Sequence, residues 1–269
     1  MPIRCERPPG APHVALVTID RVDSANALDP PALRALAATW REIASDDGVR
    51  CAVLTGAGSR VFCAGMDMKT TIPASQRLAR GERIDPDDFA GLRDAATAVL
   101  AGFDLGKPLV VAVNGHCRAV GLDLMLQSEL RYAAPHASFA LEEVARGLYP
   151  TGNATVLLPR QIGWVHAMDL LLSARPIDAA RAAAIGLVNE VVPAAELLPR
   201  ALAAAAAIAA NAPLAVRETR RGVRELLSLP LEEAWRRQEE LGRPLRRSDD
   251  AAEGARAFVE KRPPRWTGR

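Results

Sequence analysis

The sequence predicts an α/β fold in which short strands alternate with helices and a purely helical region follows. Runs rich in β-branched residues recur in the first part of the chain, and amphipathic stretches separate them. Beyond about Pro193 no strand-like run remains. We therefore expect a β/α core over residues 1–192 and a helical C-terminal region over residues 193–269.

Local signals place the first elements. Residues 14–19 (VALVTI) and 51–55 (CAVLT) are predicted strands. Between them, Asp29 followed by two prolines predicts the start of a helix, because aspartate caps free N–H groups of the first turn and proline fits there. Residues 70–86 mix proline, glycine and charge without periodicity, so we expect a surface loop in that segment.

The remaining elements follow in chain order. We expect a helix over 87–101, a strand over 108–113, a helix over 120–127, extended pieces at 131–134 and 138–140, and helices at 213–227, 231–241 and 248–260, which are broken by Pro230 and by Gly242-Arg243-Pro244.

Composition excludes several classes of function. A formal net charge of +2 and an aromatic content of 4% do not favour a nucleic-acid partner. No apolar run is long enough for a membrane span, no signal peptide is recognisable and the four cysteines show no pairing, so we expect a cytoplasmic protein. The histidines lack metal-ligand spacing, and the dinucleotide, P-loop and serine-hydrolase motifs are absent.

Two carboxylates are candidates for acid–base chemistry. Asp123 lies between Leu122 and Leu124 on a mostly apolar predicted helix, which is a poor place for a solvated acid. Glu143 follows a short apolar stretch 20 residues later, beside Glu142. Considered alone, each acid is as readily structural as catalytic. Together they form an acid–base pair if the fold brings them to one substrate.

Two loops are candidates for main-chain donors. The loop at residues 62–67 contains Gly65 after a strand, and the segment at residues 114–121 joins a strand to a helix. Free N–H groups at such turns can hold an oxyanion, although plain strand-to-helix turns have the same pattern. His116, in the second segment, is the one histidine that we keep as a possible substrate contact.

Taken in order, five segments resemble the crotonase superfamily of enoyl-CoA hydratases and isomerases. They are 20–28 (DRVDSANAL, like RPxxxNAL), 62–69 (FCAGMDMK, like F-x-A-G-x-D-[LIM]-K), 107–115 (KPLVVAVNG, like KPxxAAVNG), 184–192 (AIGLVNEVV, like AxxxGLVxxVV) and 253–262 (EGARAFVEKR, like the family's ending). Each motif is weak alone, but five in the right order indicate membership.

The resemblance implies a fold and a ligand. The fold would be a crotonase-like spiral of ββα units with a helical C-terminal trimerisation region. The substrate would be an acyl-CoA thioester, without a metal or redox cofactor, because coenzyme A enters as part of the substrate. The assembly would be a homotrimer or a dimer of trimers, with no nucleic-acid or membrane partner.

The resemblance also assigns roles to residues of this chain. The oxyanion hole would consist of the backbone N–H groups of Met66 and Val120, and the catalytic acids would be Asp123 and Glu143. Residues expected to bind substrate or coenzyme A are Ala64, Gly65, Asp67, Met68, Lys69, Gly121, Phe258 and Lys261, the last two reaching a neighbouring subunit's coenzyme A.

Four departures from the family pattern bear on the activity. The family's GGG is here Ala119-Val120-Gly121, and the first acid is aspartate where hydratases usually carry glutamate. Residues 147–153 depart from the hydratases' GxxPGxGG in their last positions, and Thr151 stands where dienoyl-CoA isomerases have a further acid. The resemblance favours an enoyl-CoA hydratase; a dienoyl- or enoyl-CoA isomerase and a non-catalytic acyl-CoA-binding protein are the alternatives.

Overall fold

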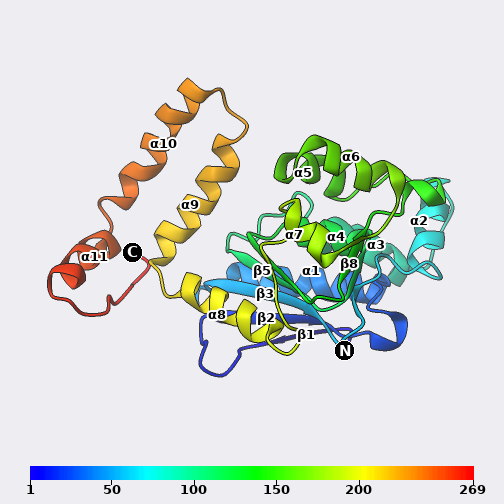
Figure 1. The fold of residues 1–269 in the computed structure, drawn as a ribbon, viewed down its shortest axis with the longest axis horizontal. Coiled ribbons are helices and arrows are strands. Elements are labelled where there is room, and N and C mark those ends of the chain that lie inside the picture. The colour runs from blue at the N-terminus through cyan, green and yellow to red at the C-terminus, as the bar shows by residue number, and fades with distance from the viewer.

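The computed structural model describes residues 1–269 and contains two sheets whose strands alternate along the chain (Figure 1). The large sheet has, in spatial order, β1 (Ile3–Glu6), β2 (Val14–Ile19), β3 (Cys51–Gly56), β5 (Leu109–Val113), β7 (Leu130–Ala133) and β10 (Glu190–Val191). The small sheet has β4 (Val61–Cys63), β6 (His116–Arg118), β8 (Ser138–Ala140) and β9 (Ile177–Asp178). Only β1–β2 and β8–β9 pair antiparallel.

Helices follow the paired strands and complete each turn of a spiral. They are α1 (Pro30–Ser45), α2 (Thr71–Ala79), α3 (Pro86–Ala98), α4 (Val120–Leu126), α5 (Ala154–Gln161), α6 (Trp164–Ser173), α7 (Ala179–Ala184), α8 (Leu197–Ala209), α9 (Pro213–Leu226), α10 (Leu231–Leu245) and α11 (Asp249–Val259), with short 3₁₀ helices η1 (Val22–Ser24) and η2 (Val144–Arg146). The orders β3–β4–α2, β5–β6–α4 and β7–β8–α5 repeat one ββα unit. The predicted α/β class is confirmed.

The large sheet is buried on both faces, which explains why its strands are continuous apolar runs. Along β2 the side chains alternate: Val14 and Leu16 pack toward α8, whereas Val17 and Ile19 pack into the main core. The predicted strands 14–19 and 51–55 are therefore confirmed, the second one ending a residue later.

Helix α1 begins where the sequence predicts. Asp29 accepts a hydrogen bond from the N–H of Ala32 at 2.9 Å, and Pro30 occupies the first helical position. The indole N–H of Trp40, on the buried face of α1, donates to the carbonyl of Ala98 at 3.0 Å and joins α1 to α3.

The far end of α4 is held by a buried guanidinium. Arg131 donates to the carbonyl oxygens of Leu126 and Ser128, where α4 ends, and to that of Leu187. Carbonyls at a helix C-terminus lack intrahelical partners and favour a cation. Arg131 therefore fixes the position of the helix that carries Asp123.

Two predicted irregular segments are helical. The prediction of a loop over 70–86 is wrong, because α2 spans Thr71–Ala79; Thr71 and Ala74 are buried, and the Thr71 hydroxyl donates to the carbonyl of Leu28 at 2.8 Å. Only these two residues of α2, one turn apart, are buried, and two positions are too few to show a helical periodicity in the sequence. The predicted break at Gly242-Arg243-Pro244 is also wrong, because α10 continues through these residues to Leu245, with Pro244 in its last turn.

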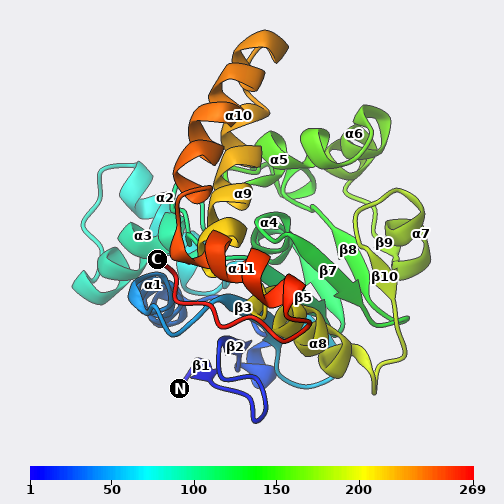
Figure 2. The same ribbon diagram turned by 90° about the vertical axis from the view of Figure 1, so that its left-hand side faces the viewer.

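The helices after Val192 divide into one that covers the sheet and three that project from the body (Figures 1 and 2). Helix α8 lays Ala201, Ala205 and Ala209 against the large sheet, and alanine at this spacing allows a close approach. The other three, α9 to α11, form what we call the arm. A cavity of about 1090 Å³ separates α9 from the body.

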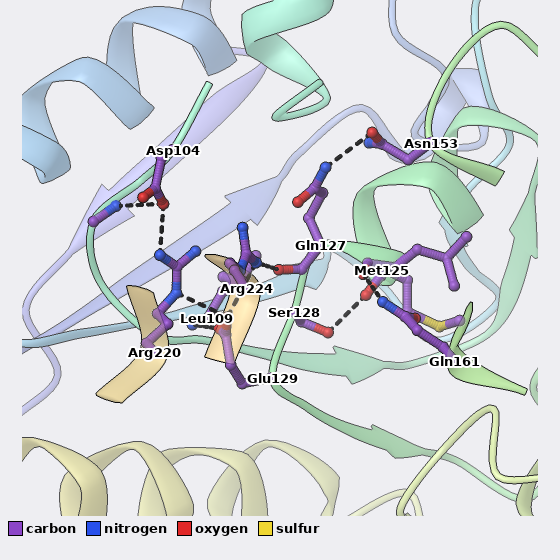
Figure 3. A network of polar contacts seen from close by, with 12 residues as sticks. Asp104, Leu109, Met125, Gln127, Ser128, Glu129, Asn153, Gln161, Arg220 and Arg224 are labelled. Carbon is purple, nitrogen blue, oxygen red and sulfur yellow. Dashed lines mark hydrogen bonds and ion pairs between the residues drawn. The ribbon is translucent and has the colours of Figure 1, made fainter. Parts of the chain in front are cut away.

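Ion pairs connect α9 to the body across that cavity (Figure 3). Arg220 pairs with Asp104 at 2.5 Å and with Glu129 at 2.8 Å, and Arg224 pairs with Glu129 at 3.1 Å. The base of the arm is tied down separately by the indole of Trp266, which donates to the carbonyl of Ala210.

No single helix is both long enough and apolar enough to cross a membrane. Helices α8 and α9 meet those criteria only when they are joined, and the chain bends by 104° between them.

Candidate active site

The first predicted donor loop presents a free N–H group at Met66. Gly65, at φ +99°, turns the chain after β4, and Met66 forms an isolated parallel bridge with Leu28. The Leu28 N–H donates to the carbonyl of Gly65, so in the planar peptide unit that follows, the N–H of Met66 points to the opposite side. That N–H has no backbone acceptor.

The second loop presents a free N–H group at Val120. The carbonyl of Ala119 accepts hydrogen bonds from the N–H groups of Leu122 and Asp123, and it therefore points along α4. The N–H of Val120, in the same peptide unit, must point out of the start of the helix. Ala119 itself adopts φ +47°, a conformation that alanine rarely takes, and its N–H is held by the carbonyl of Ala140 at 3.0 Å.

These two loops touch each other. A Cβ atom added to Gly65 would lie 3.1 Å from the Ala119 Cβ and 3.7 Å from the Val120 nitrogen. One added to Gly121 would lie 2.7 Å from the carbonyl oxygen of Cys63. The close packing requires glycine at both positions. The two loops that carry the free N–H groups of Met66 and Val120 therefore lie side by side.

Asp123 is buried and its carboxylate is fixed by main-chain donors. Only 1% of the residue is exposed, and Oδ1 accepts hydrogen bonds from the N–H groups of Asn153 and Ala154, both at 2.6 Å, at the start of α5. Burial raises the pKa of Asp123 from 3.8 to about 6, against the lowering effect of those two hydrogen bonds. Oδ2 makes no hydrogen bond within the protein.

Glu143 has a buried oxygen that no protein group satisfies. It precedes η2, and its Oε2 is inaccessible and without a hydrogen-bond partner. Burial raises the pKa of Glu143, and the charge of Asp123 raises it further. Both effects favour the protonated form of Glu143 beside the charge of Asp123. A proton donor and a proton acceptor can thus coexist here.

The residues predicted to bind coenzyme A fall into two places. Met68 and Lys69 are exposed beside the first donor loop, but the carboxylate of Asp67 is used locally, accepting from the N–H groups of Lys69 and Thr70 at 2.8 and 3.2 Å. Phe258 lies on α11, which Figure 1 shows on the arm and well apart from α4, and is 86% exposed. Lys261 directly follows α11. Within one chain, the structure does not bring these last two residues to the acids.

Two residues at the site were not singled out as site residues from the sequence. Asn153 donates to Asp123 from its main chain and from its side chain, and Gln127 donates to the Asn153 side chain at 2.9 Å. The only sequence signal is the departure from GxxPGxGG at Asn153. His116 is exposed and its Nδ1 lies 2.7 Å from the hydroxyl of Ser138.

Comparison with known proteins identifies the family. A family model described as enoyl-CoA hydratase/isomerase matches residues 11–269. The chain belongs to the enoyl-CoA hydratase/isomerase family. Among curated relatives, it is 39% identical over 257 residues to an enoyl-CoA hydratase of Mycobacterium tuberculosis, covering 96% of this chain and 94% of that one. It is 36% identical over 256 residues to the (E)-benzylidenesuccinyl-CoA hydratase of Thauera aromatica, covering 95% and 96%.

Solved structures of this family share the fold. The crystal structure of an enoyl-CoA hydratase from Bacillus anthracis superposes with a TM-score of 0.91 at 30% identity, over 100% of both chains. The crotonase-like spiral expected from the sequence is therefore confirmed. Membership makes the chain an enzyme of the enoyl-CoA hydratase/isomerase kind.

Proposed function

We propose that the protein is an enoyl-CoA hydratase that adds water reversibly across the α,β double bond of an enoyl-CoA thioester. The observation that carries the proposal is the state of the two acids: Glu143 keeps a buried, unsatisfied oxygen and Asp123 keeps one oxygen free of hydrogen bonds. Names of relatives support it, since both curated relatives described above are hydratases.

In the proposed reaction the two acids divide the proton transfers. Asp123 removes a proton from water while the water oxygen bonds to the β carbon, and the electrons of the double bond move onto the thioester oxygen. Glu143 then gives its proton to the α carbon, so that hydrogen and hydroxyl add to the same face. A proton passes from Asp123 to Glu143 and restores the starting state. No metal or redox cofactor takes part in this scheme.

The N–H groups of Met66 and Val120 would stabilise the enolate oxygen. One such donor lowers the activation barrier by about 2.7–4 kcal/mol. General acid–base catalysis adds a rate factor of about 10²–10⁴. The Val120 side chain is partly buried and packs against the main core. We propose that the residues in contact with the substrate near this oxyanion hole are Ala64, Gly65, Met68, Lys69 and Gly121.

An isomerase of the same family is the second candidate. Aspartate at position 123 favours an isomerase, because hydratases usually carry glutamate there. The exposed Thr151 argues against it, because dienoyl-CoA isomerases have a further acid at that position. An isomerase moves the double bond without consuming water.

Product analysis in water labelled with heavy oxygen separates these activities. With crotonyl-CoA and longer enoyl-CoA thioesters, the hydratase should incorporate one labelled oxygen into a 3-hydroxyacyl-CoA, as detected by mass spectrometry. Unlabelled products with a shifted double bond would favour the isomerase. Binding without any product would indicate a non-catalytic acyl-CoA-binding protein and contradict the proposal.

We further propose that the helical region at residues 193–269 assembles the protein as a homotrimer or a dimer of trimers, mainly through the arm. Apolar side chains that a lone chain leaves exposed gather on the arm: Val223, Leu227, Leu231, Trp235, Phe258 and Val259. Such a set favours burial against a second copy. In that assembly Phe258 and Lys261 would reach a neighbouring subunit's coenzyme A. Light scattering that finds a monomer would contradict the assembly.

A further inference from the structure

Asn153 clamps Asp123 from two sides. Its main-chain N–H donates to Asp123 Oδ1 at 2.6 Å, and its side-chain Nδ2 donates to the Asp123 carbonyl at 3.2 Å and to the Val99 carbonyl at 2.8 Å. The residue is buried, and no other side chain hydrogen-bonds to Asp123. Removing the Asn153 side chain would therefore release the main-chain carbonyl of Asp123, while the N–H groups of residues 153 and 154 would still reach its carboxylate.

Gln127 determines which way the Asn153 amide points. Its Nε2 donates to Asn153 Oδ1 at 2.9 Å, which leaves Asn153 Nδ2 to face the two carbonyl groups (Figure 3). A flipped amide would place oxygen against both carbonyls and nitrogen against nitrogen. The main-chain carbonyl of Gln127 in turn accepts a hydrogen bond from the Arg224 guanidinium on α9 at 3.0 Å.

The main chain of residues 152–154 encloses the Asp123 carboxylate. Gly152 packs so closely against Asp123 that a Cβ at residue 152 would lie 2.1 Å from Oδ2. The N–H groups of Asn153 and Ala154 hold Oδ1. Because Asn153 lies in the middle of this segment, its placement determines where the carboxylate lies.

We propose that Asn153, oriented by Gln127, is a positioning residue that holds the free oxygen Oδ2 of Asp123 at the place where it meets the attacking water. The inference rests on the proposed hydration.

Substitution of Asn153 tests the inference in the full-length enzyme. Asn153→Gly keeps the main-chain N–H but loses the amide that donates to the Asp123 carbonyl. It should lower kcat for crotonyl-CoA by about 10–100-fold, since a displacement of about 1 Å costs on that order, while KM changes less than about threefold.

Controls separate positioning from folding. Gln161→Ala removes an amide of the same network that bonds Leu126 and Arg131 rather than Asp123, so it should lower thermal stability while reducing kcat less than Asn153→Gly does. Gln127→Ala keeps Asn153 in place and should lower kcat several-fold, which tests the inference if Asn153→Gly fails to fold. The inference is overturned if Asn153→Gly keeps full kcat, or if it loses no more of its kcat than Gln161→Ala does. A wild type that hydrates no enoyl-CoA would instead overturn the proposed function and this inference with it.

Discussion

Glu143→Gln should reduce turnover of crotonyl-CoA by about 10²–10⁴-fold, while the variant still binds CoA thioesters. Glutamine has nearly the same shape but no acidic proton, so it removes the proposed donor to the α carbon without opening a cavity. The proton on Glu143 is favoured in the wild type because burial and the charge of Asp123 both raise its pKa. Loss of the conjugated thioester absorbance measures the rate.

The neighbouring acid provides a matched control. Glu142 is adjacent in sequence, but its carboxylate lies 3.5 Å from Arg146 and is more accessible to solvent. Glu142→Gln should therefore keep kcat within about twofold of the wild type, as expected of an exposed ion pair. If Glu143→Gln retained most of its activity, or if both variants lost it equally, Glu143 would not be the proton donor.

Gly65→Ala should lower kcat by about 10²–10³-fold, the cost of losing one oxyanion donor. The added Cβ would meet the Ala119 Cβ at 3.1 Å and push the first donor loop away from the second. Because Gly65 has φ +99°, the new side chain would also strain the turn that aims the Met66 N–H. Steady-state kinetics, with the melting temperature as a second readout, measures both effects.

Gly186→Ala distinguishes misaligned donors from general destabilisation. Gly186 also has a positive φ, of +76°, but a Cβ there would meet nothing within 4 Å. This control should lose stability and keep its kcat. Equal losses of kcat in both variants would mean that the geometry around Gly65 has no special bearing on the reaction.

The parts of the site that could be predicted from sequence are those coded by local chemistry. Gly65 follows a strand, Val120 begins a helix and Asp123 lies on its apolar face, and the structure brings these segments together as the alternation of strands and helices suggests. Glu143 was a candidate only as the second member of an acid pair, and the family resemblance gave it its expected role. Their functional roles remain proposals.

Other features depend on contacts that local patterns do not encode. Strands β4, β6 and β9 contain two or three residues each, too few to show an alternating pattern, so the small sheet was not predicted. Asn153 lies 30 residues from Asp123 in sequence, and nothing near it indicates that its amide reaches that acid. The separation of Phe258 from the acids likewise follows from the bend between α8 and α9.

The central claim is that the acids and the two N–H groups stabilise an enolate and move a proton at the α carbon. The most direct test follows the α carbon itself, by incubating a saturated thioester, butyryl-CoA, with the enzyme in deuterium oxide and measuring the mass of the recovered thioester. We predict that the wild type introduces one deuterium at the α carbon and that Glu143→Gln introduces none on the same time scale. Equal exchange by both proteins would contradict the account. So would a wild type that hydrates crotonyl-CoA but does not exchange the α hydrogen of butyryl-CoA.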